Sequence, residues 1–184
     1  ENTTNKGGGA CYELEDLQRI KQVCDANNLK FHMDGARIWN ALVAKKQDPK
    51  AFGKLFDTIS VCLSKGLGAP IGSVLLGDKK TIHSALRIRK ILGGGMRQVG
   101  YLAAAGIYAL DNNIERLAED HRRAKEIAEV LKKVSWVASV EPVETNILIF
   151  SLVPNCIEKN LIELLKQKNI SISSMGHGKL RIVT

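Results

Sequence analysis

The sequence predicts an α/β layered protein followed by a smaller α+β unit, and three observations carry this prediction. Apolar residues recur at helical spacing near the start of the chain, as at Leu14, Leu17 and Ile20. Two apolar, β-branched runs at 57–65 and 71–78 are typical of strands. Strands that alternate with helices form a sheet covered by helices.

The first helix is expected within "CYELEDLQRIKQVCDANNLK", over about four turns, with Asn27 and Asn28 as its stop. It leads into a short extended segment, "LKFHMDGAR", and then into the two strands. Beyond them runs "MRQVGYLAAAGIYALDNNIERLAEDHRRAKEIAEVLKKV", which contains no proline. This stretch predicts one long helix or two nearly continuous ones.

The remainder predicts the smaller unit: a strand in "NILIFSL", a helix in "CIEKNLIELLKQKN", and further extended runs in "ISISS" and "KLRIV". We therefore divide the chain into two domains, 1–118 and 119–184. The chain begins at Glu1 without an initiator methionine and stops within an alternating apolar run. We expect it to be part of a longer protein.

The composition fits a soluble globular protein, with 45% hydrophobic and 25% charged residues among 184. The net charge is +8, but acidic residues accompany the basic ones, so we expect no nucleic-acid partner. No apolar run approaches the roughly 20 residues of a membrane span, so we expect a cytoplasmic protein without membrane contact. The four cysteines lack metal-ligand spacing, which predicts no metal site.

Lys65 is the first candidate for chemistry, because it follows an apolar strand and ligands bind at the carboxyl ends of strands in such sheets. A partly desolvated amine has a lowered pKa and becomes the nucleophile that a Schiff base requires. Gly66, Gly68 and Gly72 leave room for a cofactor, although they match no dinucleotide or phosphate-loop fingerprint. The alternative for Lys65 is an ordinary lysine in a solvated turn.

Asp34 ends the neighbouring predicted strand, and alone it could be a turn or capping aspartate before Gly35. Asp34 and Lys65 together indicate a cofactor site. A pyridoxal phosphate (PLP) site needs an amine to form the Schiff base and a carboxylate to keep the pyridine nitrogen protonated. The pair therefore predicts a PLP enzyme.

Three stretches, "HMDGARIWNA", "CLSKGLGAPIGS" and "RKILGGGMRQVGYLAAAGIYAL", resemble the low-specificity L-threonine aldolases. These are fold-type I PLP enzymes related to the β-eliminating lyases. The resemblance implies the C-terminal part of an aspartate-aminotransferase-like large domain, followed by an incomplete small domain. It also implies that the N-terminal part of the enzyme and a C-terminal helix are missing from this chain.

The resemblance implies a role for each cofactor-binding residue. Lys65 would bear the internal aldimine, with Ser64 beside it, and Asp34 would pair with the pyridinium. Arg37 would hydrogen-bond the ring oxygen of the cofactor.

Three further basic residues gain roles in the same way. Arg181 matches the arginine that grips the α-carboxylate of the substrate, a task suited to a guanidinium fork. Lys90 and Arg97 match residues that reach the cofactor phosphate of a neighbouring subunit, so we expect a homodimer or homotetramer with shared active sites. Their alternatives are an exposed strand position for Arg181 and loop charges for Lys90 and Arg97.

The resemblance implies retro-aldol cleavage of L-threonine or L-allo-threonine to glycine and acetaldehyde in the complete protein. The fragment alone is expected to be inactive, and the base that accepts the hydroxyl proton is not identified. The alternatives are another fold-type I PLP reaction, such as β-elimination or racemisation, and a non-catalytic remnant or basic interaction module.

The sequence also departs from the family pattern, because the family's "ENTHN" reads "ENTTN" here and Thr4 occupies a histidine position. Of the histidines present, His32 is expected on the same strand face as Asp34, in a structural role. His121 and His177 are weaker candidates for a functional role, because His121 is expected on a charged helix and His177 in a glycine turn.

Overall fold

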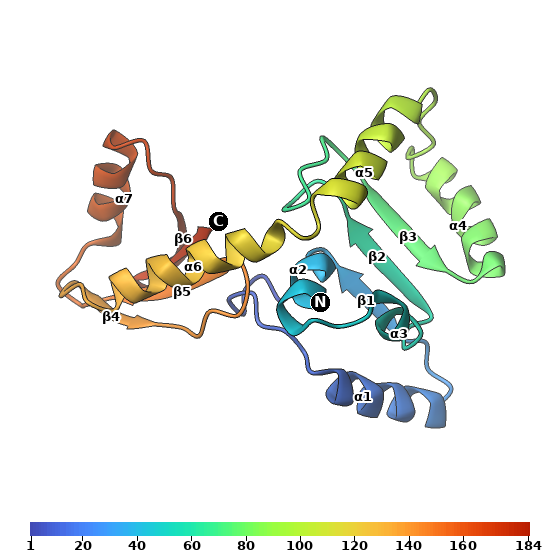
Figure 1. Ribbon diagram of the computed structural model, residues 1–184, viewed down its shortest axis with the longest axis horizontal. Helices are drawn as coiled ribbons and strands as arrows, with labels where there is room; N and C mark the ends of the chain where they lie inside the picture. The colour runs from blue at the N-terminus through green and yellow to red at the C-terminus, as the bar shows by residue number, and fades with distance from the viewer. The chain divides into compact units, whose positions relative to one another are not determined.

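The computed structural model describes all residues from 1 to 184, and the chain divides into two compact units (Figure 1). The first comprises Glu1–Thr3 and Tyr12–Leu117, and the second comprises Thr4–Cys11 and Ala118–Thr184. The segment Thr4–Cys11, assigned to the first domain from the sequence, thus groups with the second unit. Its hydrogen bonds explain this, because Thr145 Oγ1 of the second unit donates to the carbonyl of Gly9 at 2.7 Å.

The first unit is built on a three-stranded sheet of order β1-β2-β3. Its strands are β1 (His32–Gly35), β2 (Thr58–Cys62) and β3 (Ser73–Gly77). Strands β1 and β2 are parallel, so their carboxyl ends share one edge of the sheet, and β3 runs antiparallel to β2. The three strands expected from the sequence are confirmed.

Five helices accompany this sheet: α1 (Leu14–Ala26), α2 (Ile38–Lys45), α3 (Pro49–Gly53), α4 (Lys79–Ile91) and α5 (Gly100–Asn112). The expected first helix is α1. No helix was predicted from the sequence at α2, α3 or α4. Two of these begin at aspartate caps, where Asp48 accepts from the backbone of Ala51 and Asp78 accepts from that of Thr81.

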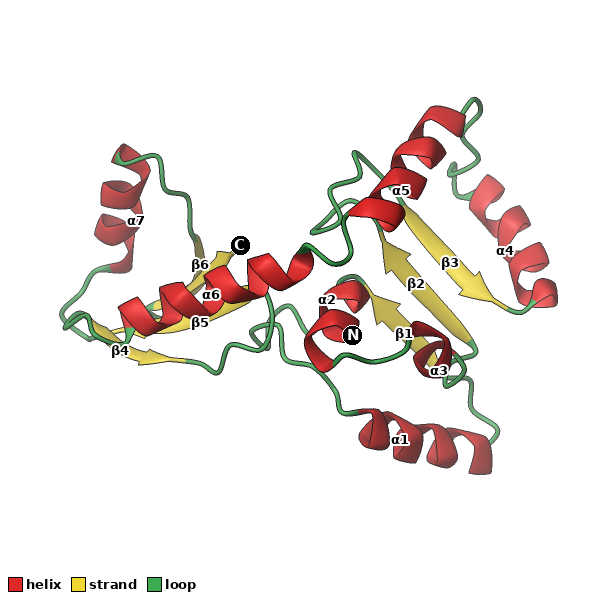
Figure 2. Cartoon of the chain, in the orientation of Figure 1, coloured by secondary structure: helices red, strands yellow, loops and turns green.

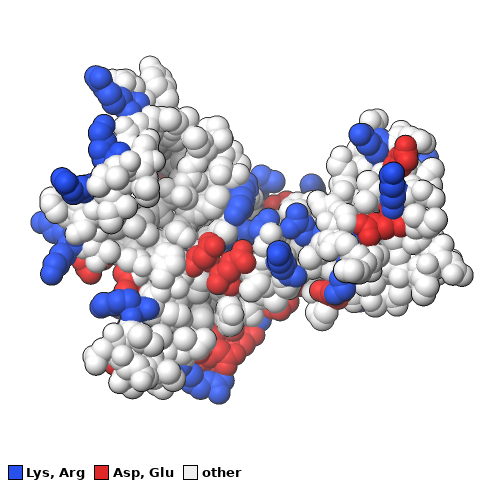
Figure 3. Space-filling view, turned by 180° about the vertical axis from the view of Figure 1, so that it is seen from behind, with Lys and Arg blue, Asp and Glu red and all other residues white.

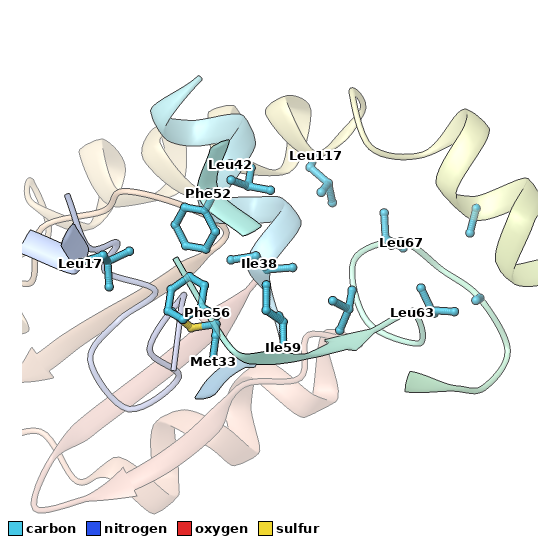
Figure 4. Close-up of a cluster of buried hydrophobic side chains, with 13 residues drawn as sticks. Leu17, Met33, Ile38, Leu42, Phe52, Phe56, Ile59, Leu63, Leu67 and Leu117 are labelled. Carbon is cyan, nitrogen blue, oxygen red and sulfur yellow. The ribbon is translucent and has the colours of Figure 1, made fainter. Parts of the chain in front are cut away.

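One face of the sheet carries the core of the first unit (Figure 4). The buried side chains include Met33 of β1 and Ile59 of β2, which pack with Ile38, Phe52 and other apolar residues. Exposure alternates along β1, so His32 and Asp34 face away from this core. The expectation that His32 shares a face with Asp34 is confirmed.

The predicted long helical region is two helices, α5 and α6 (Leu117–Leu131), separated at residues 113–116. Asparagine side chains mark the break, since Asn112 Nδ2 donates to the carbonyl of Tyr108 at 2.8 Å and Asn113 Nδ2 donates to that of Leu67 at 2.7 Å. Asparagine side chains compete in this way with the backbone bonds of a helix.

The second unit is a four-stranded antiparallel sheet of order β4-β5-β7-β6 with α6 and α7 (Figure 2). Its elements are β4 (Val137–Val140), β5 (Ile147–Leu152), α7 (Glu158–Gln167), β6 (Ser173–Gly176) and β7 (Lys179–Val183). The central strand β5 is buried at all but one position. Its core joins Leu148, Phe150 and Leu180 of the sheet to Ala128 and Leu131 of α6. None of the helices in either unit has the length and apolar character that crossing a lipid bilayer requires.

Candidate functional site

The outward face of the first sheet is polar along β1 and the part of β2 that pairs with it. Parallel pairing sets His32 beside Thr58 and Asp34 beside Ser60. A hydrogen bond of 2.8 Å between His32 Nδ1 and Thr58 Oγ1 joins the first of these pairs. His32 is therefore held by its neighbour across the strands, in agreement with the structural role expected for it.

Asp34 is exposed on this face, one residue before the end of β1. Its Oδ1 accepts the backbone N–H of Ala36 at 3.0 Å, and its Oδ2 has no hydrogen-bond partner in the chain. The next residue must be glycine, because a Cβ on Gly35 would lie 2.6 Å from the carbonyl oxygen of Ser60. Close strand packing at Gly35 thus fixes where the Asp34 carboxylate stands.

Lys65 stands in a tight loop that follows β2 at the same edge of the sheet. The loop closes through Leu63, whose N–H donates to Gly72 at 2.9 Å and whose carbonyl accepts from Ala69 at 3.1 Å. Within it, Gly68 donates to the carbonyl of Lys65 at 2.8 Å and has a φ of +75°. A side chain at Gly68 would be strained in this left-handed conformation, so the turn that presents Lys65 depends on this glycine.

Gly66 has a different reason to lack a side chain. A Cβ there would lie 2.9 Å from Leu117 Cδ2, so the loop is packed directly against a fully buried leucine. The apolar side of the loop is held in the core, and the Lys65 side is not.

Ser64 and Lys65 are both exposed, and the Lys65 amine makes no hydrogen bond or ion pair within the chain. The partial desolvation expected for Lys65 is therefore not provided by this chain. The cause is the open face around the loop, since all five residues of β3 are exposed. The only bond of the Ser64 side chain is a contact of 3.5 Å between its Oγ and Cys62 Sγ.

Arg37 precedes α2 as its N-cap and is half-buried. Its carbonyl accepts the N–H of Asn40 at 3.0 Å, which starts the helix. The residue therefore lies just beyond β1, at the same edge of the sheet as Asp34.

Lys90 and Arg97 lie further along the chain, near the end of α4 and in the loop that follows it. Both are exposed, and neither side chain makes a hydrogen bond or ion pair within the chain. Helix α4 carries several lysines and arginines and no acidic residue, and basic side chains line this edge of the molecule in Figure 3. The structure joins neither residue to Asp34 or Lys65 by a direct contact.

Arg181 belongs to the second unit, on β7 between β5 and β6. Its Nη1 donates to Asn5 Oδ1 at 2.8 Å, and its Nε is buried without a partner. Burying the Nε donor of this guanidinium without a partner carries a free-energy cost. Arg181 is thus more constrained than the exposed strand arginine that the sequence offered as its alternative.

Two asparagines of the "ENTTN" stretch were missed as site neighbours. Asn5 contacts Arg181, and the buried Asn2 donates its N–H to the carbonyl of Asp34 at 3.0 Å. The only sequence signal was the run of polar residues before three glycines, which is typical of a specialised turn. The two remaining histidines lie elsewhere: His121 is buried in α6 and His177 turns the chain between β6 and β7.

The carboxylate and the amine at this edge of the sheet fit PLP. Asp34 offers a free carboxylate oxygen of the kind that would accept the pyridine N–H, and Lys65 offers an unpaired amine at the end of the neighbouring strand. The chain contains no group of three or more His, Cys, Asp or Glu side chains arranged to hold a metal ion.

Comparison with protein families gives a match to the beta-eliminating lyase family over residues 1–153. The chain is 45% identical to a probable low-specificity L-threonine aldolase 2 of Arabidopsis thaliana over 80% of its length and 42% of the relative's. It is 44% identical to the low specificity L-threonine aldolase of Escherichia coli, covering 95% of this chain and 50% of the relative. The chain therefore spans about half the length of the curated relatives it matches.

Solved structures give the same fold. A putative L-allo-threonine aldolase of Listeria monocytogenes superposes with a TM-score of 0.84 at 21% identity, covering 98% of this chain and 52% of the other. A histidinol-phosphate aminotransferase of Clostridium acetobutylicum superposes with a TM-score of 0.69 at 17% identity, covering 99% of this chain and 57% of the other. The predicted fold-type I α/β class is confirmed.

Proposed function

Because this chain belongs to the beta-eliminating lyase family, we propose that the complete protein is a PLP-dependent threonine aldolase. It would cleave L-threonine or L-allo-threonine to glycine and acetaldehyde. The observation that carries the proposal is the placement of two groups at one edge of two parallel strands: Asp34, which has an unengaged carboxylate oxygen, and Lys65, which has an unpaired amine.

We assign Lys65 as the residue that holds the cofactor covalently and Asp34 as the acceptor of its pyridine N–H. Arg37 and Ser64 serve as further cofactor contacts at the same edge of the sheet. When bound, PLP supplies an electron sink for the bond electrons that substrate cleavage releases. The carboxylate of Asp34 preserves that capacity because it keeps the ring nitrogen protonated.

We assign Arg181 to the α-carboxylate of the substrate. A guanidinium held in a fixed orientation fixes the amino acid in turn, and orientation decides which bond to Cα breaks. For an aldol cleavage this is the bond from Cα to Cβ. The β-hydroxyl loses its proton as the aldehyde forms, while Cα keeps the bond electrons.

Three wider assignments complete the proposal. Residues 1–118 belong to the cofactor-binding large domain, apart from Thr4–Cys11 and Ala118, which group with the second unit, and 119–184 belong to the small domain. Lys90 and Arg97 reach the cofactor phosphate of a neighbouring subunit, in a homodimer or homotetramer, and their exposure and lack of partners in this chain support that role. The protein acts in the cytoplasm.

The experiment that tests the proposal is to incubate the complete protein with PLP, reduce it with borohydride, digest it and locate the pyridoxyl group by mass spectrometry. We expect the label on Lys65. The matched control is Lys65→Arg, which keeps the charge at an exposed position and cannot carry the label. A label on another lysine, or none on a folded protein, would overturn the assignment.

Product analysis then separates this reaction from its rivals on the same fold. Glycine and acetaldehyde from either threonine diastereomer would support the aldolase. A keto acid with ammonia would indicate β-elimination, and the opposite enantiomer of the substrate would indicate racemisation. A folded protein that takes up no cofactor and binds nucleic acid in a salt-sensitive manner would be a basic interaction module instead.

A further inference from the structure

The segment Thr4–Cys11 forms a tight turn that depends on its glycines. The N–H of Thr4 donates to the carbonyl of Ala10 at 3.2 Å, and the N–H of Gly9 donates back to that of Thr4 at 2.8 Å. Gly8 and Gly9 have φ angles of +70° and +75°, which side chains other than glycine rarely adopt. The turn thus has one defined backbone shape.

This turn is fixed to the second unit around the start of β5. The buried hydroxyl of Thr145 donates to the carbonyl of Gly9 at 2.7 Å. A Cβ on Gly8 would lie 3.6 Å from Ile149 Cδ1, and one on Gly9 would lie 3.1 Å from Ile147 Cβ. The backbone of the turn therefore packs closely against the side chains of β5.

The turn presents Asn5 to Arg181, which is 176 residues away in the sequence. Asn5 Oδ1 accepts from Arg181 Nη1 at 2.8 Å. Arg181 stands on β7, and its Cα partners are Ile149 of β5 and Ser173 of β6, so the arginine backbone is also fixed. Both ends of the hydrogen bond are held by the structure around them.

The chemistry of the acceptor distinguishes this contact from an ordinary ion pair. The amide oxygen of Asn5 is uncharged, so it accepts a hydrogen bond and leaves the guanidinium its full charge, whereas a carboxylate would neutralise that charge. Arg181 Nε is buried without a partner, so an incoming anion must be received by the terminal nitrogens. Asn5 accepts a hydrogen bond from one terminal nitrogen, Nη1. The remaining N–H groups of the two terminal nitrogens stay available to a ligand.

We propose that Asn5 is a positioning residue that orients the Arg181 guanidinium for a substrate carboxylate without competing for its charge. The inference deepens the proposed function and rests on it for the identity of the carboxylate as that of an amino acid. Asn5 acts through Arg181 and does not itself touch the reacting atoms.

The test compares Asn5→Asp and Asn5→Ala in the complete protein loaded with PLP. Asn5→Asp keeps the size and the acceptor but adds a charge that competes with the ligand. We expect the dissociation constant of glycine, followed by the change in cofactor absorption, to rise roughly 10- to 100-fold in Asn5→Asp, the range for a charged hydrogen-bond partner. Asn5→Ala should weaken binding less, with KM for threonine rising more than kcat falls.

The matched control is Lys6→Gln, which changes an exposed residue on the same turn. It should leave glycine affinity unchanged. If Asn5→Asp and Asn5→Ala bind glycine as the unmodified protein does, or lower only the melting temperature, the positioning role is wrong and Asn5 merely anchors the turn.

A second readout needs no cofactor. Phenylglyoxal modifies accessible arginines, and its rate at Arg181 can be followed by peptide mass spectrometry in the complete protein without PLP. Acetate should slow this reaction in the unmodified protein, and less so in Asn5→Asp. No protection by acetate in any variant would overturn the inference, whereas absence of aldolase activity with protection intact would overturn only the proposed function.

Discussion

The predicted functional residues of the two sheets differ in their burial and in their hydrogen bonds. In the second unit, β5 is buried almost throughout, and Arg181 on the adjacent strand is half-buried and hydrogen-bonded to Asn5. In the first unit, β3 is exposed at every position, and Lys65 has no partner. The second unit therefore holds the side chain of its functional residue by itself, whereas the first unit holds only the backbone around Lys65 and leaves the side chain open.

The largest expected effect tests whether the two units are independent cores. Phe52 and Phe150 are each 1% exposed, one in each unit. Truncation of either to alanine should lower the free energy of unfolding of its own unit by about 3–5 kcal/mol, through lost burial and the cavity left behind. Hydrogen exchange read peptide by peptide checks this.

In each variant, protection should fall in the unit that carries the substitution and persist in the other. Equal loss of protection in both units after either substitution would show that their cores are not independent, because the chain would then unfold as a single cooperative body.

A smaller effect is expected at Asp57, which ties the start of β2 to β1. It accepts from the N–H of Phe31 at 2.9 Å and from Lys30 Nζ at 2.8 Å. Asp57→Ala should destabilise the first unit by about 1–3 kcal/mol, because a part-buried backbone donor loses its acceptor. Denaturant titration measures this, with Asp16→Ala as the control, since Asp16 pairs with Arg19 at an exposed position that does not contact Asp57. If Asp57→Ala lowers the free energy of unfolding no more than the control does, Asp57 does not tie the start of β2 to β1.

The two units should also respond to acid at different pH values. The hydrogen bond from Lys30, with that from the Phe31 backbone, lowers the pKa of Asp57 from 3.8 to about 2. Its folded-state pKa lies below the unfolded value, so its stabilisation is complete above about pH 4 and is lost as the pH falls through about 2.

In the second unit, burial lowers the pKa of His121 below 6.5, partly opposed by the charge of Asp120. The unfolded chain then binds this proton more readily, so stability declines as the pH falls below 6.5. We expect the second unit to weaken first on acidification, as followed by hydrogen exchange across a pH series. His121→Gln should flatten that decline, and an unchanged decline in this variant would refute the role of His121.

The smallest effect is expected on the open strand. Leu76 of β3 is 47% exposed, and Leu76→Thr should change the unfolding free energy of this chain by no more than about 0.5 kcal/mol. The matched change Leu148→Thr, on the buried β5, should cost several times more. Similar losses of unfolding free energy at both positions in denaturant titrations would show that β3 is covered. The two sheets would then not differ in burial as described.

The sequence predicted the parts of the fold that repeat a local period. Leu14, Leu17 and Ile20 predicted α1, and the apolar run at β5 predicted a strand. The break between α5 and α6 was left undecided because no proline or glycine marks it, and the side-chain bond from Asn113 to the Leu67 carbonyl is a tertiary contact. Helix α4 buries none of its residues, so its position could not be inferred from a core pattern.

The candidate site also has features that the sequence could predict and features that it could not. Asp34 and Lys65 could be found because each follows an apolar run, and the parallel register sets them at one edge of the sheet. The exposure of Lys65 could not be predicted, because it depends on what covers β3. Nor could the contact of Asn5 with Arg181, since no local pattern connects residues 176 apart.

The assignment of Thr4–Cys11 to the second unit has a consequence for how this protein can be recombined at the level of the gene. The coding sequence for 118–184 does not encode the whole second unit, because eight residues of that unit precede almost all of the first. A chimera joined at the 117/118 boundary would give Arg181 and Thr145 a foreign partner in place of Asn5 and Gly9. An exchange that keeps the second unit intact must carry both segments, so the unit is inherited as two separate blocks.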